Sequence, residues 1–186
     1  KELLAQKYNC PLDKYLVCFS SPDARKNIPR TINAFNRALP DLPEDTKLLV
    51  IGAPPKNDPD FVNSANENKS VIFTGPIDSV KQILGSADAM IFASLYEGFG
   101  LPILEAFSMH LPVITSNSSS MSEVAADAAL LINPQDIDSI CAAITKLYTD
   151  PAITQKLIES GKERLKSFSW QNTANKTLDV YKKLTN

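Results

Sequence analysis

The sequence predicts an α/β fold in which a doubly wound parallel sheet of about six strands carries helices on both faces. Short apolar runs alternate with segments of helical periodicity from one end of the chain to the other. The runs are continuously apolar, as is typical of parallel strands that are covered on both faces. Alternating strands and helices with crossover connections give a right-handed sandwich of this kind.

The predicted strands are six short runs rich in aliphatic residues. They are YLVCFS (15–20), KLLVIG (47–52), SVIFTG (70–75), DAMIFASL (88–95), LPVITS (111–116) and ALLIN (129–133). Helices are predicted between and after them, at 28–39, 58–67, 78–86, 101–110, 121–126, 136–148, 151–167 and 170–184.

Residues that favour helix starts support several of these helices. Asn27 precedes an Ile-Pro pair, which predicts an N-cap followed by a proline in the first turn. Ser120 and Glu123 have the spacing of a capping box. Ser169 precedes the last helix. Its apolar residues recur at helical spacing and are expected to pack inward: Trp170, Ala174, Leu178 and Tyr181.

Size alone fits one globular domain or a domain with a short appendage, and we expect a single domain spanning residues 1–186. The net charge is -2, and no basic cluster suggests a nucleic-acid partner. No apolar run is long enough to span a bilayer. The number of cysteines is odd, and the three lie far apart in the sequence: Cys10, Cys18 and Cys141. This predicts free thiols and a reducing compartment. The chain begins at Lys1, so we expect it to be a piece of a longer protein.

Ligands of a doubly wound sheet gather at the carboxyl ends of its strands. Arg25 and Lys26 follow the first strand and precede a helix start, which favours anions, so they could clamp a diphosphate. The alternative is a solvated basic turn. Gly75 and Pro76 follow the third strand and could either form a plain turn or expose backbone groups to a flat base.

Two acids and two glycines surround the end of the fourth strand. Gly98 and Gly100 would let backbone N–H groups approach an anion, and Pro102 fits the first helical turn. Glu105 leans back toward that helix start, where neutral ribose hydroxyls would suit it, and Glu97 could reach a second polyol beyond the phosphates. A nucleotide sugar would explain all four residues. The alternative is that both acids are exposed helix-end residues.

Other phosphate-binding motifs do not fit the sequence. The GFGLPI segment lacks the third glycine of a dinucleotide fingerprint and follows the fourth strand instead of the first. No GxxxxGK[ST] sequence occurs, and the first strand is not followed by an acidic pair.

The segments EGFGLPILE and LPVITSNSSSMSEVAADAALLINPQD resemble the nucleotide-sugar-binding domain of the retaining group 1 glycosyltransferases, which have the GT-B fold. RKNIPRTINAF and FSWQNTANKTLDVYKKL are similar too. The resemblance implies a Rossmann-like domain that forms the carboxyl-terminal half of a two-domain enzyme. The amino-terminal, acceptor-binding half is then expected to be absent from this chain.

The resemblance also implies roles for individual residues. Arg25 and Lys26 match the basic pair that neutralises the leaving diphosphate, Glu97 matches the acid near the transferred sugar, and Glu105 matches the ribose-binding acid. Backbone contacts are implied for Gly75, Pro76 and Ile77 with the base, and for Phe99, Gly100 and Leu101 with sugar and phosphate.

Two positions depart from the family pattern. Ser20 and Ser21 stand where a glycine commonly opens the first loop, which puts the fit near the diphosphate in doubt. His110 stands where glycine is usual at a helix end, so we expect a structural residue in the left-handed region and not a catalytic base.

The implied partners are a UDP-, GDP- or ADP-sugar donor and an acceptor glycan or lipid-linked saccharide bound by the other half. No metal or other cofactor is expected, because the basic pair and the helix dipole neutralise the leaving group. The resemblance implies a cytoplasmic enzyme, or one held at the inner face of the membrane through the other half. A GT-B sugar-nucleotide epimerase and a non-catalytic nucleotide-sugar-binding module are the alternatives. The presence of Glu97 and Lys26 argues against the binding module.

Overall fold

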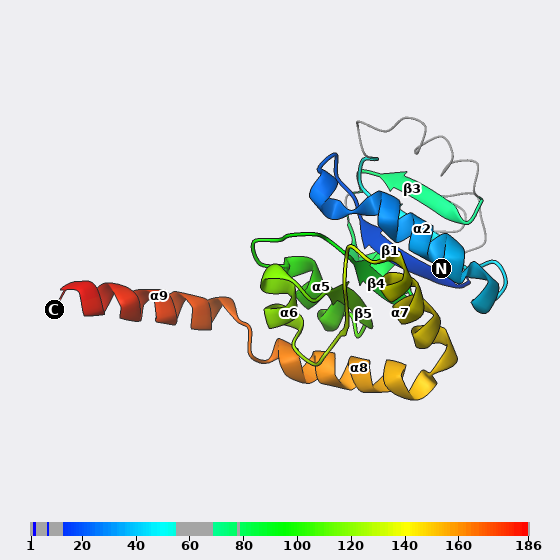
Figure 1. Ribbon diagram of the computed structural model, residues 1–186. Coiled ribbons are helices and arrows are strands. Elements are labelled where there is room, and N and C mark those ends of the chain that lie inside the picture. The colour runs from blue at the N-terminus through cyan, green and yellow to red at the C-terminus, as the bar shows by residue number, and fades with distance from the viewer. Residues whose placement is uncertain (1, 3–6, 8–12, 55–68, 78, 186) are drawn as a thin grey trace.

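The structure is a computed structural model that describes all residues except 1, 3–6, 8–12, 55–68, 78 and 186 (Figure 1). The helix predicted at 58–67 and Cys10 therefore lie outside the described residues. All other predicted strands and helices are present, with boundaries that differ by a few residues.

Six parallel strands form one sheet in the order β3-β2-β1-β4-β5-β6. Their bounds are β1 Tyr15–Phe19, β2 Lys47–Ile51, β3 Val71–Gly75, β4 Ala89–Phe92, β5 Val113–Ser116 and β6 Leu130–Ile132. The chain runs outward from β1 to β3, returns to the centre at β4, and then runs outward in the other direction. This is the doubly wound topology that the sequence predicts.

Helices cover both faces of the sheet, and each face has its own apolar core. The longer helices are α2 Ile28–Ala38, α5 Leu101–Ser108, α6 Ser119–Ala125, α7 Ile137–Thr149, α8 Pro151–Leu165 and α9 Trp170–Thr185. Helices α2 and α7 pack on one face, and α5 and α6 pack on the other together with the short α4, Lys81–Leu84. Figure 1 shows α8 running along the foot of the domain.

Strand residues alternate between these two cores because successive side chains of a strand point to opposite faces. Leu16 and Cys18 join the core under α2 and α7, whereas Tyr15 and Val17 join the core under α4 to α6. Complete burial raises the pKa of the Cys18 thiol to about 12. Cys18 and the partly exposed Cys141 are both free thiols, as predicted.

The last helix does not pack inward, so that prediction is wrong. Helix α9 extends away from the rest of the domain (Figure 1), and Trp170 and Tyr181 are 80% and 62% exposed. Its helical spacing therefore gives an amphipathic helix whose apolar side is not covered by this domain. None of the described helices combines the length and the apolar character needed to cross a bilayer.

The predicted capping box at Ser120 and Glu123 is also wrong. Helix α6 begins two residues earlier than predicted, at Ser119, after an N-cap at Ser118 whose side chain makes no capping hydrogen bond. The Ser120 hydroxyl instead donates to the backbone oxygen of Glu97, at 2.9 Å. The prediction for His110 is confirmed: its φ is 57°, just beyond the end of α5.

Candidate functional site

The point where the sheet reverses direction brings together the segments that follow β1 and β4. These strands are neighbours at the centre of the sheet, yet their connections leave toward opposite edges. Such a switch point opens a crevice at the carboxyl ends of the strands. The backbone N–H of Leu95, after β4, donates to the backbone oxygen of Arg25, after β1, at 2.8 Å. The two segments that carry most of the predicted charged residues are therefore in direct contact.

Lys26 and Glu97 form an ion pair across this junction. The Lys26 ammonium donates to Glu97 Oε1 at 2.7 Å, and the two side chains are only 21% and 17% exposed. The ammonium also lies 5.1 Å from the ring centre of Phe92, within the range of a cation–π contact. The buried Ser94 hydroxyl donates to the same Glu97 oxygen at 2.8 Å. Two donors thus fix one carboxylate oxygen of Glu97.

Arg25 lies next to this pair but has a partner of its own. Its guanidinium donates to Asp23 through Nε at 2.8 Å and lies 2.7 Å from Asp23 Oδ2 through Nη2. The hydrogen bonds and charge of Arg25 lower the pKa of Asp23, and Asp23 in turn raises the pKa of Arg25. Both side chains are largely exposed. The two cations of the predicted basic pair are neighbours in the sequence, but each forms an ion pair with a different acid.

The glycine turn after Glu97 leads into α5 as predicted. Gly100 is the N-cap with a φ of 99°, a conformation that side chains rarely adopt, and no side chain caps the helix. Pro102 occupies the first turn and has no N–H to satisfy. An uncapped helix start beside Lys26 and Glu97 is suited to a phosphate oxygen.

A run of serines after β5 holds the Glu97 loop, and the sequence analysis missed this role. The backbone N–H of Glu97 donates to Ser119 Oγ at 3.2 Å, and the Ser120 hydroxyl donates back to the backbone oxygen of Glu97. Ser116 Oγ donates to the oxygen of Ser94 at 2.6 Å. The available signal was the NSSS run itself, which directly follows a strand and so lies at the functional edge of the sheet.

The first loop also differs from expectation. Ser20 takes part in the strand ends instead of opening toward a ligand, since its hydroxyl donates to the oxygen of Ala53 at 2.6 Å. The backbone comes close to Ser20 at Gly52, where an added Cβ would lie 2.3 Å from the backbone oxygen of Ser20. Gly52 was not singled out from the sequence, although its place directly after β2 is the same signal that marked the other sites.

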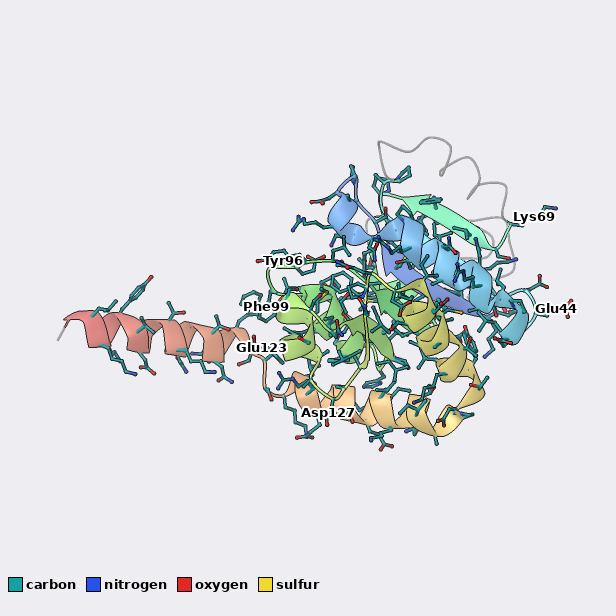
Figure 2. All side chains as sticks on the ribbon, viewed as in Figure 1. Glu44, Lys69, Tyr96, Phe99, Glu123 and Asp127 are labelled. Carbon is teal, nitrogen blue, oxygen red and sulfur yellow. The ribbon has the colours of Figure 1, made fainter. Side chains whose placement is uncertain are left out.

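Glu105 lies apart from the ion pair, on the exposed side of α5. It lines a groove of about 360 Å³ between α5 and the segment that joins α8 to α9. The groove wall is mostly apolar and includes Leu101, Leu104, Leu165, Phe168 and Phe99. Phe99 and Phe168 meet edge to face with ring centres 6.0 Å apart. Figure 2 shows Tyr96 and Phe99 on the same side of the molecule, on the loop before α5.

Gly75 ends β3, and Pro76 and Ile77 follow it, at the same edge of the sheet but on its outermost strand. Pro76 is exposed, whereas Ile77 packs partly against the core beneath it. Across the described part of the chain, no cluster of three or more His, Cys, Asp or Glu side chains could hold a metal ion.

Comparison with known proteins identifies the family. Residues 1–164 match the family described as glycosyl transferases group 1. The chain belongs to this family. The sequence analysis predicted the same family, and this prediction is confirmed.

Several proteins named mannosyltransferases are similar to this chain. The O-antigen chain mannosyltransferase B of Escherichia coli is 31% identical over 188 residues, which are 96% of this chain and 48% of that protein. The MMP alpha-(1->4)-mannosyltransferase of Mycolicibacterium hassiacum is 34% identical over 57% of this chain and 27% of its own length. The chain thus spans about half the length of the E. coli relative and a smaller share of the Mycolicibacterium relative.

Solved structures show the same fold. Sucrose-phosphate synthase from Thermosynechococcus elongatus matches with a TM-score of 0.79 and 26% identity, over 100% of this chain and 49% of that one. The α,α-trehalose 6-phosphate synthase from Burkholderia multivorans matches with a TM-score of 0.77 at 16% identity, over 99% of this chain and 45% of its own, and supports the fold alone. The predicted Rossmann-like α/β fold is confirmed.

Proposed function

We propose that this chain is the donor-binding domain of a retaining, metal-independent glycosyltransferase. It would hold a nucleoside diphosphate sugar while an acceptor hydroxyl attacks the anomeric carbon from the side of the leaving diphosphate. The observation that carries the proposal is the Lys26–Glu97 pair at the switch point, next to the uncapped start of α5. A cation for the diphosphate and an acid for the sugar lie there in direct contact.

Each part of the site has a place in this proposal. Lys26, Arg25 and the N–H groups at the start of α5 neutralise the diphosphate as the bond to the sugar breaks. Glu97 accepts hydrogen bonds from the sugar through the oxygen that Lys26 and Ser94 leave free. Glu105 accepts hydrogen bonds from the ribose.

The remaining positions contact the ligand through their backbone. They are Gly75, Pro76 and Ile77 at the base, and Gly98, Phe99, Gly100 and Leu101 at the sugar and phosphates. The acceptor would be a glycan or lipid-linked saccharide bound by a second domain. Mannose is the sugar that we propose, since the E. coli and Mycolicibacterium relatives are named mannosyltransferases.

Calorimetry with UDP, GDP and ADP, each with and without a chelator, tests the proposal. One nucleotide should bind equally well in both conditions. Lys26→Ala should weaken that binding about 10- to 100-fold, because a charge-assisted hydrogen bond contributes about 1.5–3 kcal/mol. Lys156→Ala, which removes an exposed lysine from α8, is the matched control and should bind normally.

Two outcomes would contradict the proposal. A strict requirement for Mg²⁺ would contradict metal independence, and unchanged affinity of the Lys26→Ala variant would remove the proposed clamp. Once the base is known, the mannose nucleotide should bind more tightly than the matching glucose nucleotide.

A further inference from the structure

Asn27, the residue after Lys26, is buried and its side-chain amide is fully hydrogen-bonded. It is 4% exposed. Its Nδ2 donates to the backbone oxygens of Ala93 at 3.0 Å and Pro134 at 2.7 Å, and its Oδ1 accepts from Arg30 at 3.0 Å. The side chain therefore ties the start of α2 to the end of β4 and to the loop between β6 and α7.

This arrangement corrects the helix-capping role expected for Asn27. The residue does occupy the N-cap position of α2, but its side chain makes no capping hydrogen bond. Its φ of 56° lies in the left-handed region, which asparagine and glycine tolerate better than other residues. A capping side chain would stabilise the helix. The Asn27 side chain does not cap, so its contribution comes from the three hydrogen bonds that it makes instead.

Three consecutive residues before α2 each contact the segment from Phe92 to Glu97. The oxygen of Arg25 accepts from Leu95, the ammonium of Lys26 contacts Glu97, and the amide of Asn27 donates to the end of β4. Two of these contacts are made by side chains, and of the two only that of Asn27 is a short, buried group. Together with the Arg25–Leu95 backbone bond, it fixes the backbone from which the flexible Lys26 side chain reaches its partner.

We propose that Asn27 is a positioning residue that sets where the Lys26 ammonium lies relative to Glu97 and the donor diphosphate. Binding sites need their charged groups held within a fraction of an ångström by supporting contacts. The effect on nucleotide binding rests on the proposed function. The effect on the Lys26–Glu97 pair does not, because that contact exists without a ligand.

Two variants separate the amide from the backbone conformation. Asn27→Asp keeps the size but points carboxylate oxygens at two carbonyl oxygens. Asn27→Gly keeps the left-handed conformation without strain and removes all three side-chain bonds, so it should fold even where Asn27→Asp does not. Each should weaken binding of the nucleoside diphosphate about 10-fold, a loss typical of one misplaced charge-assisted hydrogen bond.

A Lys26→Ala background separates positioning from a structural role alone. If Asn27 acts through Lys26, its variants should lower nucleotide affinity only about 2-fold or less in that background, because the effects of interacting residues are not additive. Tyr148→Phe is the matched control, since it removes a hydrogen bond of 3.1 Å to Asp88, next to the amino end of β4. It should lower the melting temperature without changing nucleotide affinity.

A ligand-free measurement keeps this inference distinct from the proposed function. The coupling between Lys26 and Glu97 is measured by chemical denaturation of Lys26→Met, Glu97→Gln and the double variant, in wild-type and Asn27→Gly backgrounds. We expect the coupling to fall to less than half in the Asn27→Gly background. Unchanged coupling, or normal nucleotide affinity in the Asn27→Gly variant, would overturn the inference. If the wild type binds none of the nucleotides, the proposed function would be overturned instead.

Discussion

Each cation of the candidate site rests against its own carboxylate. Arg25 pairs with Asp23, and Lys26 pairs with Glu97, so the four side chains together carry no net charge. An incoming diphosphate must therefore compete with two acids that are already in place. The Arg25–Asp23 pair is exposed and its partners are two residues apart, so it should yield more easily than the largely buried Lys26–Glu97 pair.

Removing the charge of Asp23 should strengthen nucleotide binding. Asp23→Asn keeps a side-chain oxygen that can accept from the Arg25 N–H, so the short 3-10 helix Ala24–Lys26 keeps its N-cap. Arg25 then becomes available to the diphosphate, and one like charge disappears. We expect calorimetry at low salt to show affinity raised by about 2- to 5-fold, in line with the small energy of exposed ion pairs.

Asp138→Asn is the matched control, because Asp138 forms an exposed ion pair with Arg37 at 2.6 Å that involves neither Asp23 nor Arg25. It should leave the affinity unchanged. Because salt screens exposed charges, the gain of Asp23→Asn should shrink as ionic strength rises. Weaker binding by Asp23→Asn would show that Asp23 helps to place Arg25 instead of withholding it.

Glu105 can be tested with deoxynucleotides, since its proposed partner is the ribose. A 2′- or 3′-deoxy nucleotide should bind the wild type more weakly by about 1–3 kcal/mol, and Glu105→Ala should lose a similar amount with the normal nucleotide. The two losses should not add, because each removes the same interaction. Calorimetry of both nucleotides with both proteins gives the coupling directly.

Glu97→Ala is the counterpart of this experiment. It frees Lys26, so it should not weaken the bare nucleoside diphosphate, whereas the sugar-bearing donor should bind less tightly. If Glu105→Ala discriminates against deoxyribose as strongly as the wild type does, Glu105 is only an exposed helix residue.

Sequence reasoning identified residues whose chemical type and place after a strand were informative. Lys26, Glu97 and Gly100 are of this kind. The partners of Asn27 are not, because Ala93 and Pro134 lie 66 and 107 positions away and contribute only backbone oxygens. Such contacts leave no trace in residue type, so only the folded chain reveals them.

At the level of elements, apolar runs located the strands but overestimated their lengths. The run at 88–95 predicts a strand to its end, yet β4 stops at Phe92. Ala93 and Ser94 are buried as well, but their backbone oxygens accept from side chains of other segments. Asn27, which follows β1, donates to Ala93, and Ser116, the last residue of β5, donates to Ser94. Burial is what a hydrophobic pattern reports, and here burial serves the site as well as the sheet.

The inward packing expected of α9 failed for a related reason. Helical spacing of apolar residues predicts an amphipathic helix, but it does not say which surface the apolar side will meet. In this structure Trp170 and Leu184 are about four-fifths exposed, at 80% and 79%. An isolated helix of this length is marginal in water, so we expect α9 to be stabilised by contacts outside this domain.

Removing α9 should therefore leave the domain intact. A chain that ends after Phe168 keeps the contact between Phe168 and Phe99, and it loses the exposed helix with the part of the groove wall formed by Ser169, Trp170 and Thr173. We expect the melting temperature measured by circular dichroism to change by less than about 2 °C, since no large buried area is lost.

The control is a chain that ends before α8. That helix buries Leu157 and packs Gly161 against Phe107, where an added Cβ would lie only 2.8 Å from the ring. Its loss should unfold the domain. A large fall in melting temperature on removing α9 alone would mean that α9 packs against the domain in solution.

For the whole molecule, the fold class was predictable because alternating strands and helices reflect local physics along the chain. The order of the strands is a property of the assembled sheet, and it decides which loops meet. Since β1 and β4 are neighbours, two loops about 70 residues apart form one site, as the Lys26–Glu97 separation of 71 shows. The sequence marked both loops as functional without showing that they touch.

The assembled site faces outward at one edge of a single domain. The Lys26 and Glu97 side chains keep about a fifth of their surface exposed, and Tyr96 and Phe99 beside them are 57% and 45% exposed. Catalysis in such a site depends on excluding water and on holding the acceptor in line with the donor. The chain spans about half of the E. coli mannosyltransferase that it resembles, so we expect the other wall to come from a second domain.

The last prediction follows from this open geometry. The 186-residue chain alone should bind its nucleotide donor but should not transfer the sugar to an acceptor. Release of nucleoside diphosphate from the sugar donor, measured with and without simple mannosides as acceptors, should stay far below about 1 s⁻¹, the lower end of typical enzyme turnover. Calorimetry on the same sample confirms that the donor site is folded. Steady turnover at or above that rate would mean that this domain alone holds the acceptor and excludes water, and the two-domain account of the reaction would be wrong.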